Sequence, residues 1–301
     1  MLFRSGPLAG GSSLVRWIER ELGFPNSMVD RIVPHTTDEL RDRVQGLLGV
    51  RDRWPVATES FTQWVLEDRF VAGRPPWQLA GVEFVADVAP FEDMKLRLLN
   101  AAHSAIAYLG VVAGWQTVDA AIAQPALRGF IDTMLKREVE PTLAEGSVPA
   151  GYRERLLQRF ANAALAHRCA QIAMDGSQKM PQRLLGTVRD RLDAGAPVEH
   201  LALAVAAWLH FLRGHDEVGE RYTVDDPEAD ALVQVHREAE VVADPQARAA
   251  LFTRSIAAFG CLADDLRWVT VLAPALRSLR ERGVLVSLNS LALRHNPLTT
   301  P

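Results

Sequence analysis

Three side chains that can carry acid–base chemistry lie close together in one stretch of the chain, Phe91 to Gly110, which reads FEDMKLRLLNAAHSAIAYLG. If this stretch is an α-helix with about 100° of rotation per residue, Asn100 lies about 140° around the helix from Lys95, and His103 lies about 80° from it. A lysine, an amide and an imidazole then share one broad side of the helix. A neutral lysine amine can accept the proton of an alcohol, while the amide and the imidazole can donate hydrogen bonds to the developing alkoxide.

The position of Lys95 in this predicted helix suits a base, but it also fits a simpler interpretation. Lys95 follows Pro90 near the helix start, where the positive end of the helix dipole favours an uncharged amine. Glu92, one turn earlier, opposes that effect. In the alternative interpretation Lys95 is a surface residue paired with Glu92, Asn100 makes a local hydrogen bond and His103 belongs to the core. The spacing alone leaves both interpretations open.

Two further stretches carry a resemblance to a known family. Residues Phe24 to Pro34 read FPNSMVDRIVP, an extended segment bounded by prolines, and Asp175 to Arg183 read DGSQKMPQR. Together with MKLRLLNAAHS, they resemble the polyol-specific long-chain dehydrogenase/reductase family, the family of mannitol 2-dehydrogenase and fructuronate reductase. The resemblance runs from about Trp17 to about Leu285.

The resemblance implies an NAD(P)-dependent oxidoreductase that interconverts a secondary sugar alcohol or aldonate with its ketose or keto acid, without a metal. It implies that Lys95 is the general base and that Asn100 and His103 orient the substrate. No cluster of cysteines and histidines with zinc-ligand spacing occurs in the sequence, and no metal is expected.

Four other positions also match family positions. By resemblance, Asp30 lies beside the nicotinamide and the substrate, Glu92 is linked to proton exchange with solvent, and Lys179 belongs to the substrate pocket. An Asp-Arg pair in a loop is also a common local hydrogen-bonding device, so both roles stay open for Asp30. Gln171 stands where some mannitol-oxidising relatives carry an arginine, which leaves open a neutral hexitol or a sugar acid as substrate.

The expected domain organisation follows from a missing glycine pattern. In the family, NAD or NADP binds mainly to an N-terminal Rossmann domain, whose glycine-rich turn lets the backbone approach the pyrophosphate. No such turn occurs here, since the cluster Gly6 to Gly11 follows no strand. We therefore expect residues 1–23 to be a remnant outside the family, residues 24–301 to be the C-terminal substrate and catalytic domain, and the Rossmann domain to be missing. A truncated, catalytically inactive helical domain that does not bind cofactor is the competing prediction.

Composition excludes several classes of partner. The 301 residues carry a formal charge of −4 and no basic block, which argues against nucleic acid. The most apolar run, Leu201 to Leu212, is shorter than the roughly 18 residues of a membrane-spanning helix and predicts a buried helix. Two isolated cysteines and an N-terminus without an apolar core favour the cytoplasm. The sequence does not indicate an oligomeric state.

The elements that must position these residues are mainly α-helices. Apolar residues at three-and-four spacing predict helices over 12–22, 37–48, 91–113, 125–144, 149–162, 177–194, 198–213, 226–240, 245–254 and 266–282. Glu59 to Phe70 and Val82 to Val88, rich in β-branched and aromatic residues, predict a short strand pair. The resemblance places the helical part among domains similar to the C-terminal domain of 6-phosphogluconate dehydrogenase.

Overall fold

The structure is a computed structural model that describes residues 11–294, and the chain divides into two compact units. The sheet unit is made of residues 11–31 and 60–92. The helical unit is made of residues 32–59 and 93–294. Most of the residues are helical and only one small sheet is described, which confirms the mainly α prediction at this coarse level.

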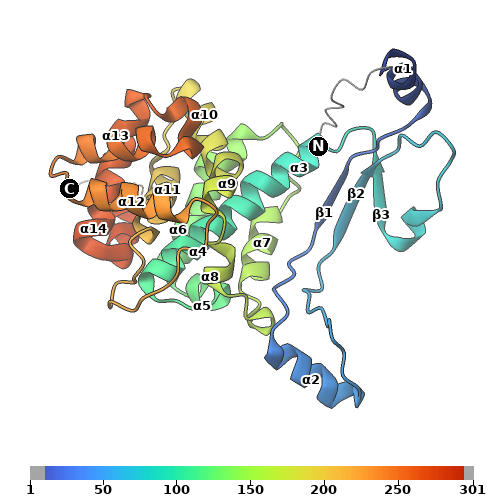
Figure 1. The fold of residues 1–301 in the computed structure, drawn as a ribbon, viewed down its shortest axis with the longest axis horizontal. Helices are drawn as coiled ribbons and strands as arrows, with labels where there is room; N and C mark the ends of the chain where they lie inside the picture. The colour runs from blue at the N-terminus through green and yellow to red at the C-terminus, as the bar shows by residue number, and fades with distance from the viewer. Residues whose placement is uncertain (1–10, 295–301) are drawn as a thin grey trace. The chain divides into compact units, whose positions relative to one another are not determined.

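The sheet unit contains three short strands, β1 (Ser27–Asp30), β2 (Gln63–Glu67) and β3 (Val82–Val85), which lie side by side in that order in Figure 1. β1 and β2 are antiparallel, whereas β2 and β3 are parallel. The predicted strand pair is therefore confirmed as β2 and β3, and β1 is a third strand within the segment predicted to be extended. Met28, Val65 and Val88 form the small core of this unit.

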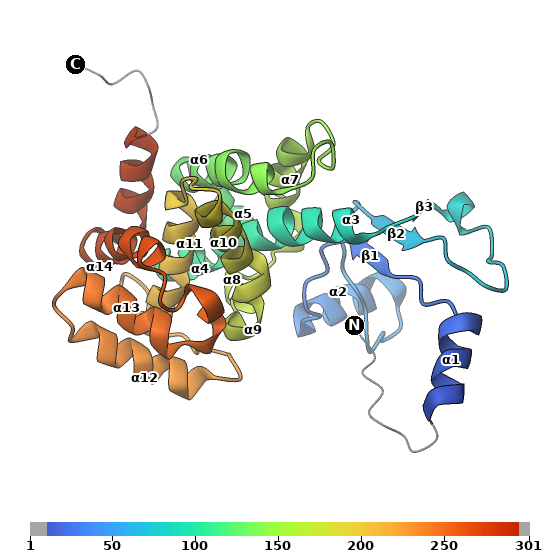
Figure 2. The same cartoon turned by 90° about the horizontal axis from the view of Figure 1, so that it is seen from above.

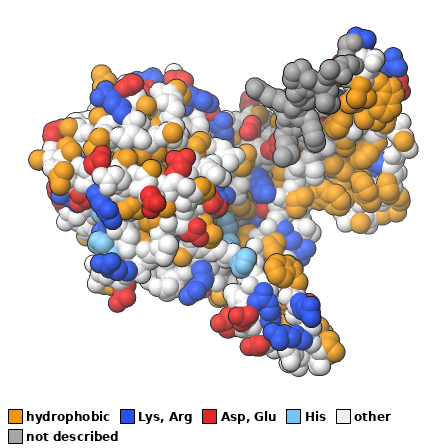
Figure 3. Space-filling model, viewed as in Figure 1, with side chains coloured by type: hydrophobic (Ala, Val, Ile, Leu, Met, Phe, Trp, Pro, Cys, Tyr) orange, Lys and Arg blue, Asp and Glu red, His pale blue; other side chains and the backbone are white. Residues whose placement is uncertain are grey.

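Large apolar side chains also remain exposed on the sheet unit, and hydrophobic atoms gather over it in Figure 3. Among them are Trp17, Phe24, Val29, Trp64 and Leu79. Isolated exposed apolar residues are ordinary, but a group of them on a unit with so small a core marks a surface suited to contact with another polypeptide.

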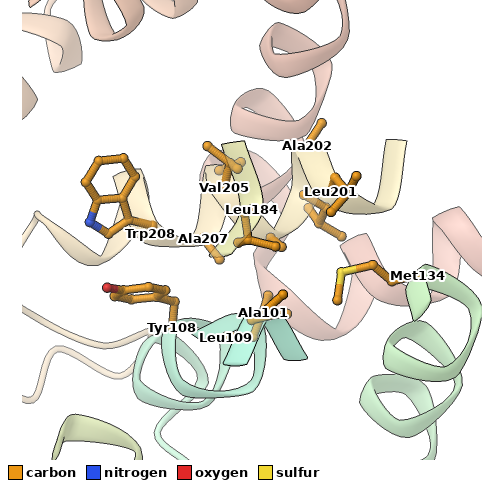
Figure 4. Close-up of a cluster of buried hydrophobic side chains, with 14 of the residues drawn as sticks. Ala101, Tyr108, Leu109, Met134, Leu184, Leu201, Ala202, Val205, Ala207 and Trp208 are labelled. Carbon is orange, nitrogen blue, oxygen red and sulfur yellow. The ribbon is translucent and has the colours of Figure 1, made fainter. Parts of the chain in front are cut away.

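The helical unit is organised around two helices that are buried on almost every side. They are α4 (Ala101–Ala113) and α11 (Glu199–Phe211), which pack against each other. In Figure 4, Tyr108 and Leu109 of α4 face Ala207 and Trp208 of α11. The apolar run Leu201 to Leu212 is thus a buried helix, as predicted.

Other α-helices of the helical unit range from four residues in α8 to 29 residues in α14. They are α2 (Asp38–Leu48), α5 (Val118–Ile122), α6 (Pro125–Met134), α7 (Tyr152–Phe160), α8 (Cys169–Ile172), α9 (Gly176–Met180), α10 (Gly186–Asp193), α12 (Ala229–Glu240), α13 (Pro245–Ser255) and α14 (Leu266–Arg294), while α1 (Gly11–Glu21) belongs to the sheet unit. Figure 2 shows α12 and α13 side by side. The predicted helices recur within a few residues of their expected bounds, but α5 and α8 are too short to show periodicity. α14 continues past 282 through a bend at Gly283, whose φ of 76° suits glycine.

One helical run, Ala89–Ala113, is long and apolar enough to cross a membrane by length and composition. Its most apolar window is 72% buried inside the protein, as the core helix of a globular protein would be. The run consists of α3 (Ala89–Met94), a π-helical turn at Lys95–Asn100, and α4, and the division between the two units falls after Glu92.

Three π-helical turns occur in the helical unit at Lys95–Asn100, Leu135–Val139 and Pro181–Leu185. The first of them packs against both of the others. In each, a backbone N–H bonds the carbonyl five residues earlier, as Ala101 does to Leu96. Such turns are rare and occur frequently at functional sites.

Candidate active site

The π-helical turn changes how Lys95, Asn100 and His103 are arranged. Sequence reasoning assumed a regular α-helix, which spreads the three side chains over about 140°. One residue added to a turn rotates all later side chains back by about 100°. Asn100 then lies about 40° from Lys95, and His103 about 20° away on the other side. The irregular turn therefore brings the three residues onto one narrow side of the helix.

Burial along the run agrees with this arrangement. Lys95 and Asn100 are half-buried, and His103 is 7% exposed, whereas Leu98 and Ala102 are completely buried. The side that carries the three polar residues is thus partly accessible at Lys95 and Asn100 and nearly closed at His103.

Lysine itself is unusual in this chain. The sequence holds only three lysines, Lys95, Lys136 and Lys179. Lys95 and Lys179 lie in two of the segments that carry the family resemblance, whereas Lys136 is exposed on the π-helical turn after α6. The protein otherwise uses arginine for its cationic side chains. The distribution of lysine therefore favours a specific use of the amine at Lys95 and Lys179.

His103 occupies a crowded and cationic pocket. Its ring lies 4.7 Å from the Phe160 ring and 5.6 Å, edge-on, from the His167 ring, measured between centroids. Burial lowers the pKa of His103 well below its usual range, and the neighbouring His167, Arg183 and Arg159 lower it further. The imidazole is therefore neutral at physiological pH and has one N–H to donate.

Arg183 is a site residue that sequence reasoning missed. Its guanidinium donates a 3.1 Å hydrogen bond to the Ser104 hydroxyl, next to His103 in the chain. It comes from the π-helical turn that packs against the turn holding Lys95. Arg183 is the last residue of the string DGSQKMPQR, which was the only sequence signal for it.

A buried ion pair lies next to the wall of the His103 pocket that Phe160 forms. The Glu59 carboxylate accepts hydrogen bonds from Arg159 at 2.7 Å and from the Ile32 backbone N–H at 2.7 Å. Arg159 precedes Phe160, which contacts His103. The pair thus fixes the end of α7 against residues 32–59 and holds Phe160 in place.

Lys179 lies on α9, in a loop and helix held by several hydrogen bonds. Its ammonium donates to the Met174 carbonyl at 2.7 Å and lies 3.4 Å from the Asp175 carboxylate. The Asp226 carboxylate accepts hydrogen bonds from the backbone and hydroxyl of Ser177 at 2.8 and 2.6 Å. The assignment of Lys179 to the substrate pocket stays a prediction, since these contacts tie it to its own segment.

The other two predicted site residues belong to the sheet unit. Asp30 ends β1, is 2% exposed and lies opposite Gln63 of β2. Glu92 is half-buried in α3, and its N–H bonds the Val88 carbonyl. Their predicted roles beside the nicotinamide and in proton exchange remain predictions.

Within residues 11–294, no three His, Cys, Asp or Glu side chains are grouped in a way that could hold a metal ion. The same residues contain no glycine-rich turn between a strand and a helix that would cradle a pyrophosphate. What they do present is an amine, an amide and a neutral imidazole on one side of a helix, suited to proton removal and oxyanion stabilisation.

Comparison with known proteins identifies the family. The sequence-family model of the mannitol dehydrogenase C-terminal domain matches residues 87–279. The family model of the mannitol dehydrogenase Rossmann domain matches residues 9–79. D-mannonate oxidoreductase of Escherichia coli strain K12 is 43% identical over 276 residues, which are 90% of this chain and 55% of that protein. Mannitol 2-dehydrogenase of Phaeosphaeria nodorum is 41% identical over 273 residues, covering 89% and 46%.

A solved structure is similar over nearly the whole chain. It is the ternary complex of Pseudomonas fluorescens mannitol 2-dehydrogenase with NAD and D-mannitol, with a TM-score of 0.83 at 35% identity, covering 95% of this chain and 57% of that one. The chain belongs to the mannitol dehydrogenase family. It spans about half the length of the curated relatives it matches.

One expectation is corrected by this comparison. The match of residues 9–79 to the Rossmann-domain model means that the prediction of a missing Rossmann domain is not supported. The prediction relied on the phosphate-binding turn, but other strands and helices of such a domain carry no glycine signature. The domain boundary predicted after residue 23 stays a prediction.

Proposed function

We propose that this chain provides the substrate-binding and proton-transfer residues of an NAD(P)-dependent oxidoreductase that interconverts a secondary sugar alcohol or aldonate with its ketose or keto acid. The observation that carries the proposal is the π-helical turn, which aligns Lys95, Asn100 and His103 within the segment that matches the family's C-terminal domain. The names of the relatives support the substrate class, since they include mannonate and mannitol enzymes.

The proposed chemistry uses three residues of the helical unit. In alcohol oxidation Lys95, as the neutral amine, takes the hydroxyl proton of the substrate. Asn100 and the neutral His103 donate hydrogen bonds to the oxygen as it gains negative charge, and each such donor contributes a few kcal/mol to lowering the barrier. In the reverse direction the lysine ammonium returns the proton to the carbonyl oxygen.

Roles for the remaining predicted residues complete the proposal. Asp30 is assigned to the nicotinamide and substrate, Glu92 to proton exchange with solvent, and Lys179 to the substrate pocket. The nicotinamide cofactor supplies hydride transfer in enzymes of this type. Within residues 11–294 no glycine-rich turn joins a strand to a helix in the way that would hold the cofactor's pyrophosphate. Gln171 is half-buried and is the position that we expect to influence the choice between hexitol and sugar acid.

Two broader inferences accompany this function. We infer that the helical unit is of the type found in the C-terminal domain of 6-phosphogluconate dehydrogenase, because two buried helices organise it. A cytoplasmic location fits the two unpaired cysteines, Cys169 and Cys261.

The proposal is tested in a hybrid enzyme in which this chain replaces the matching segment of D-mannonate oxidoreductase. Reduction of fructuronate and of fructose by NADH or NADPH is followed spectrophotometrically. Lys95→Ala is expected to lower kcat by about 10²- to 10⁴-fold, with a much smaller change in KM, because a general base acts in the transition state. Lys136→Ala, the matched control on an exposed lysine, is expected to leave both constants unchanged.

The competing prediction, an inactive helical domain, gives a different result. It requires that the purified chain by itself binds neither NADH nor NADPH and reduces neither substrate. If the hybrid is active and Lys95→Ala keeps near-normal turnover per folded molecule, the catalytic assignment of Lys95 has to be abandoned.

A further inference from the structure

A small polar cavity lies directly beside His103 in the helical unit. Its polar lining comes from His103, Asp119, Arg159, Asn162 and His167, and the rest of its wall is apolar. The volume open to the centre of a water molecule is about 10 Å³. This is close to the smallest volume that holds one water, provided that two to four polar partners surround it.

Two polar atoms around this cavity lack hydrogen-bond partners. Asp119 Oδ1 and His167 Nδ1 are both buried, and neither has a partner among the residues that the structure describes. Buried polar atoms are nearly always hydrogen-bonded to protein or to ordered water, because leaving them unsatisfied is unfavourable. Both atoms belong to residues that line this one water-sized cavity.

The backbone holds the two residues in fixed positions. The Val118 N–H donates to the His167 carbonyl at 2.9 Å, and the Cys169 N–H donates to the Gln116 carbonyl at 3.0 Å. These bonds join the start of α5, which carries Asp119, to the segment that leads into α8. The His167 ring also contacts the His103 ring edge-on at 5.6 Å.

We propose that this cavity binds one water molecule that joins Asp119, His167 and His103, and that Asp119 and His167 are positioning residues for the His103 ring. The water donates one hydrogen to the Asp119 carboxylate and the other to a ring nitrogen of His103, and it accepts a hydrogen bond from the Nδ1–H of His167. This contact fixes one tautomer of His103, so that its N–H points to the substrate oxygen. The assignment rests on the proposed function for the identity of that oxygen.

The charges facing His103 agree with such a role. Arg183 and Arg159 face it from two other helical segments, His167 faces it from the loop before α8, and together with burial they hold its pKa low. A neutral imidazole exists as either of two tautomers. Without a partner on one nitrogen, both would be populated, and only one of them would donate in the required direction.

The water and the tautomer are tested first on the purified chain, without activity. A high-resolution crystal structure is expected to show one water molecule within hydrogen-bond distance of Asp119 Oδ1 and His167 Nδ1. Nitrogen-15 NMR of labelled histidines is expected to show a single neutral tautomer for His103. A crystal structure without that water, or a mixture of tautomers in the unaltered chain, would overturn the proposal.

Variants separate positioning from packing. His167→Phe keeps the ring contact but removes the nitrogen, and Asp119→Leu removes the acceptor; both are expected to give mixed His103 tautomers. Asp119→Asn keeps an acceptor oxygen and is expected to restore the single tautomer. Asp230→Leu, on an exposed carboxylate of α12, is the control and is expected to change nothing. Unchanged His103 signals in His167→Phe or in Asp119→Leu, once folded, contradict the proposal.

The activity measurement distinguishes this proposal from the proposed function. In the hybrid enzyme, His167→Phe is expected to lower kcat by about two- to tenfold with little change in KM, because a misdirected donor is lost only from the transition state. A hybrid that is inactive towards polyols and ketoses, yet shows the water and the single tautomer, refutes the function and leaves the positioning intact. An active hybrid in which His167→Phe keeps full kcat refutes the positioning.

Discussion

Gly176, in the DGSQKMPQR segment, is expected to reject even a methyl group. A Cβ at this position would lie 2.5 Å from Trp208 Nε1 and 2.6 Å from the Tyr108 hydroxyl. Both rings belong to the buried pair α4 and α11, shown in Figure 4, so neither can move into solvent. The Tyr108 hydroxyl also donates to the Ala173 carbonyl at 3.1 Å, and displacing the ring would break that bond.

The expected loss of stability follows from these contacts. Overpacking a core costs about 1 to 3 kcal/mol, and a buried hydroxyl without its partner costs about 1 to 3 kcal/mol more. The gain in helix propensity from glycine to alanine offsets up to about 1 kcal/mol. Gly176→Ala is therefore expected to lower the free energy of unfolding by about 1 to 6 kcal/mol, measured by urea denaturation with tryptophan fluorescence.

A matched glycine provides the control. Gly129 lies within α6, and a Cβ there would meet no atom within 4 Å, so Gly129→Ala is expected to raise stability by up to about 1 kcal/mol. Adding Tyr108→Phe to Gly176→Ala removes the crowded hydroxyl and is expected to recover part of the loss. If Gly176→Ala is as stable as the unaltered chain, the close packing of this segment against α4 and α11 is refuted.

Three further outcomes are expected. Glu59→Gln breaks the buried pair with Arg159 and should lower the free energy of unfolding by about 3 to 5 kcal/mol in urea denaturation, and a loss below 1 kcal/mol would contradict the pairing. Burial, followed by Arg213, lowers the pKa of His210 to about 3; since the unfolded histidine binds protons near pH 6.5, this group should lower stability as pH falls from about 6.5 towards 3. Between pH 6.5 and pH 3, the thermal midpoint of His210→Gln should fall less than that of the unaltered chain. Gly110→Ala would place a Cβ 2.8 Å from the Cys169 sulfur, so it should destabilise the fold, and Cys169→Ala should rescue it; a rescue that fails would refute this contact.

The sequence by itself determined most of the helices and the segments that identify the family. Apolar periodicity is a local property, so helices such as α11 and α12 could be predicted within a few residues. The same holds for β2 and β3, whose β-branched and aromatic residues are typical of strands. The strings around Lys95 and Asp30 carried the family resemblance because motif residues adjoin in the chain.

The tertiary structure decided how those residues are arranged. The π-helical turn at Lys95–Asn100 packs against two other π-helical turns, and no local sequence signal indicated the rotation that aligns Lys95 with Asn100 and His103. Arg183 reaches Ser104 across 79 residues of sequence, and His167 reaches the same pocket from the loop before α8. Such contacts depend on which helices pack together, and packing is set by the whole core rather than by any single segment.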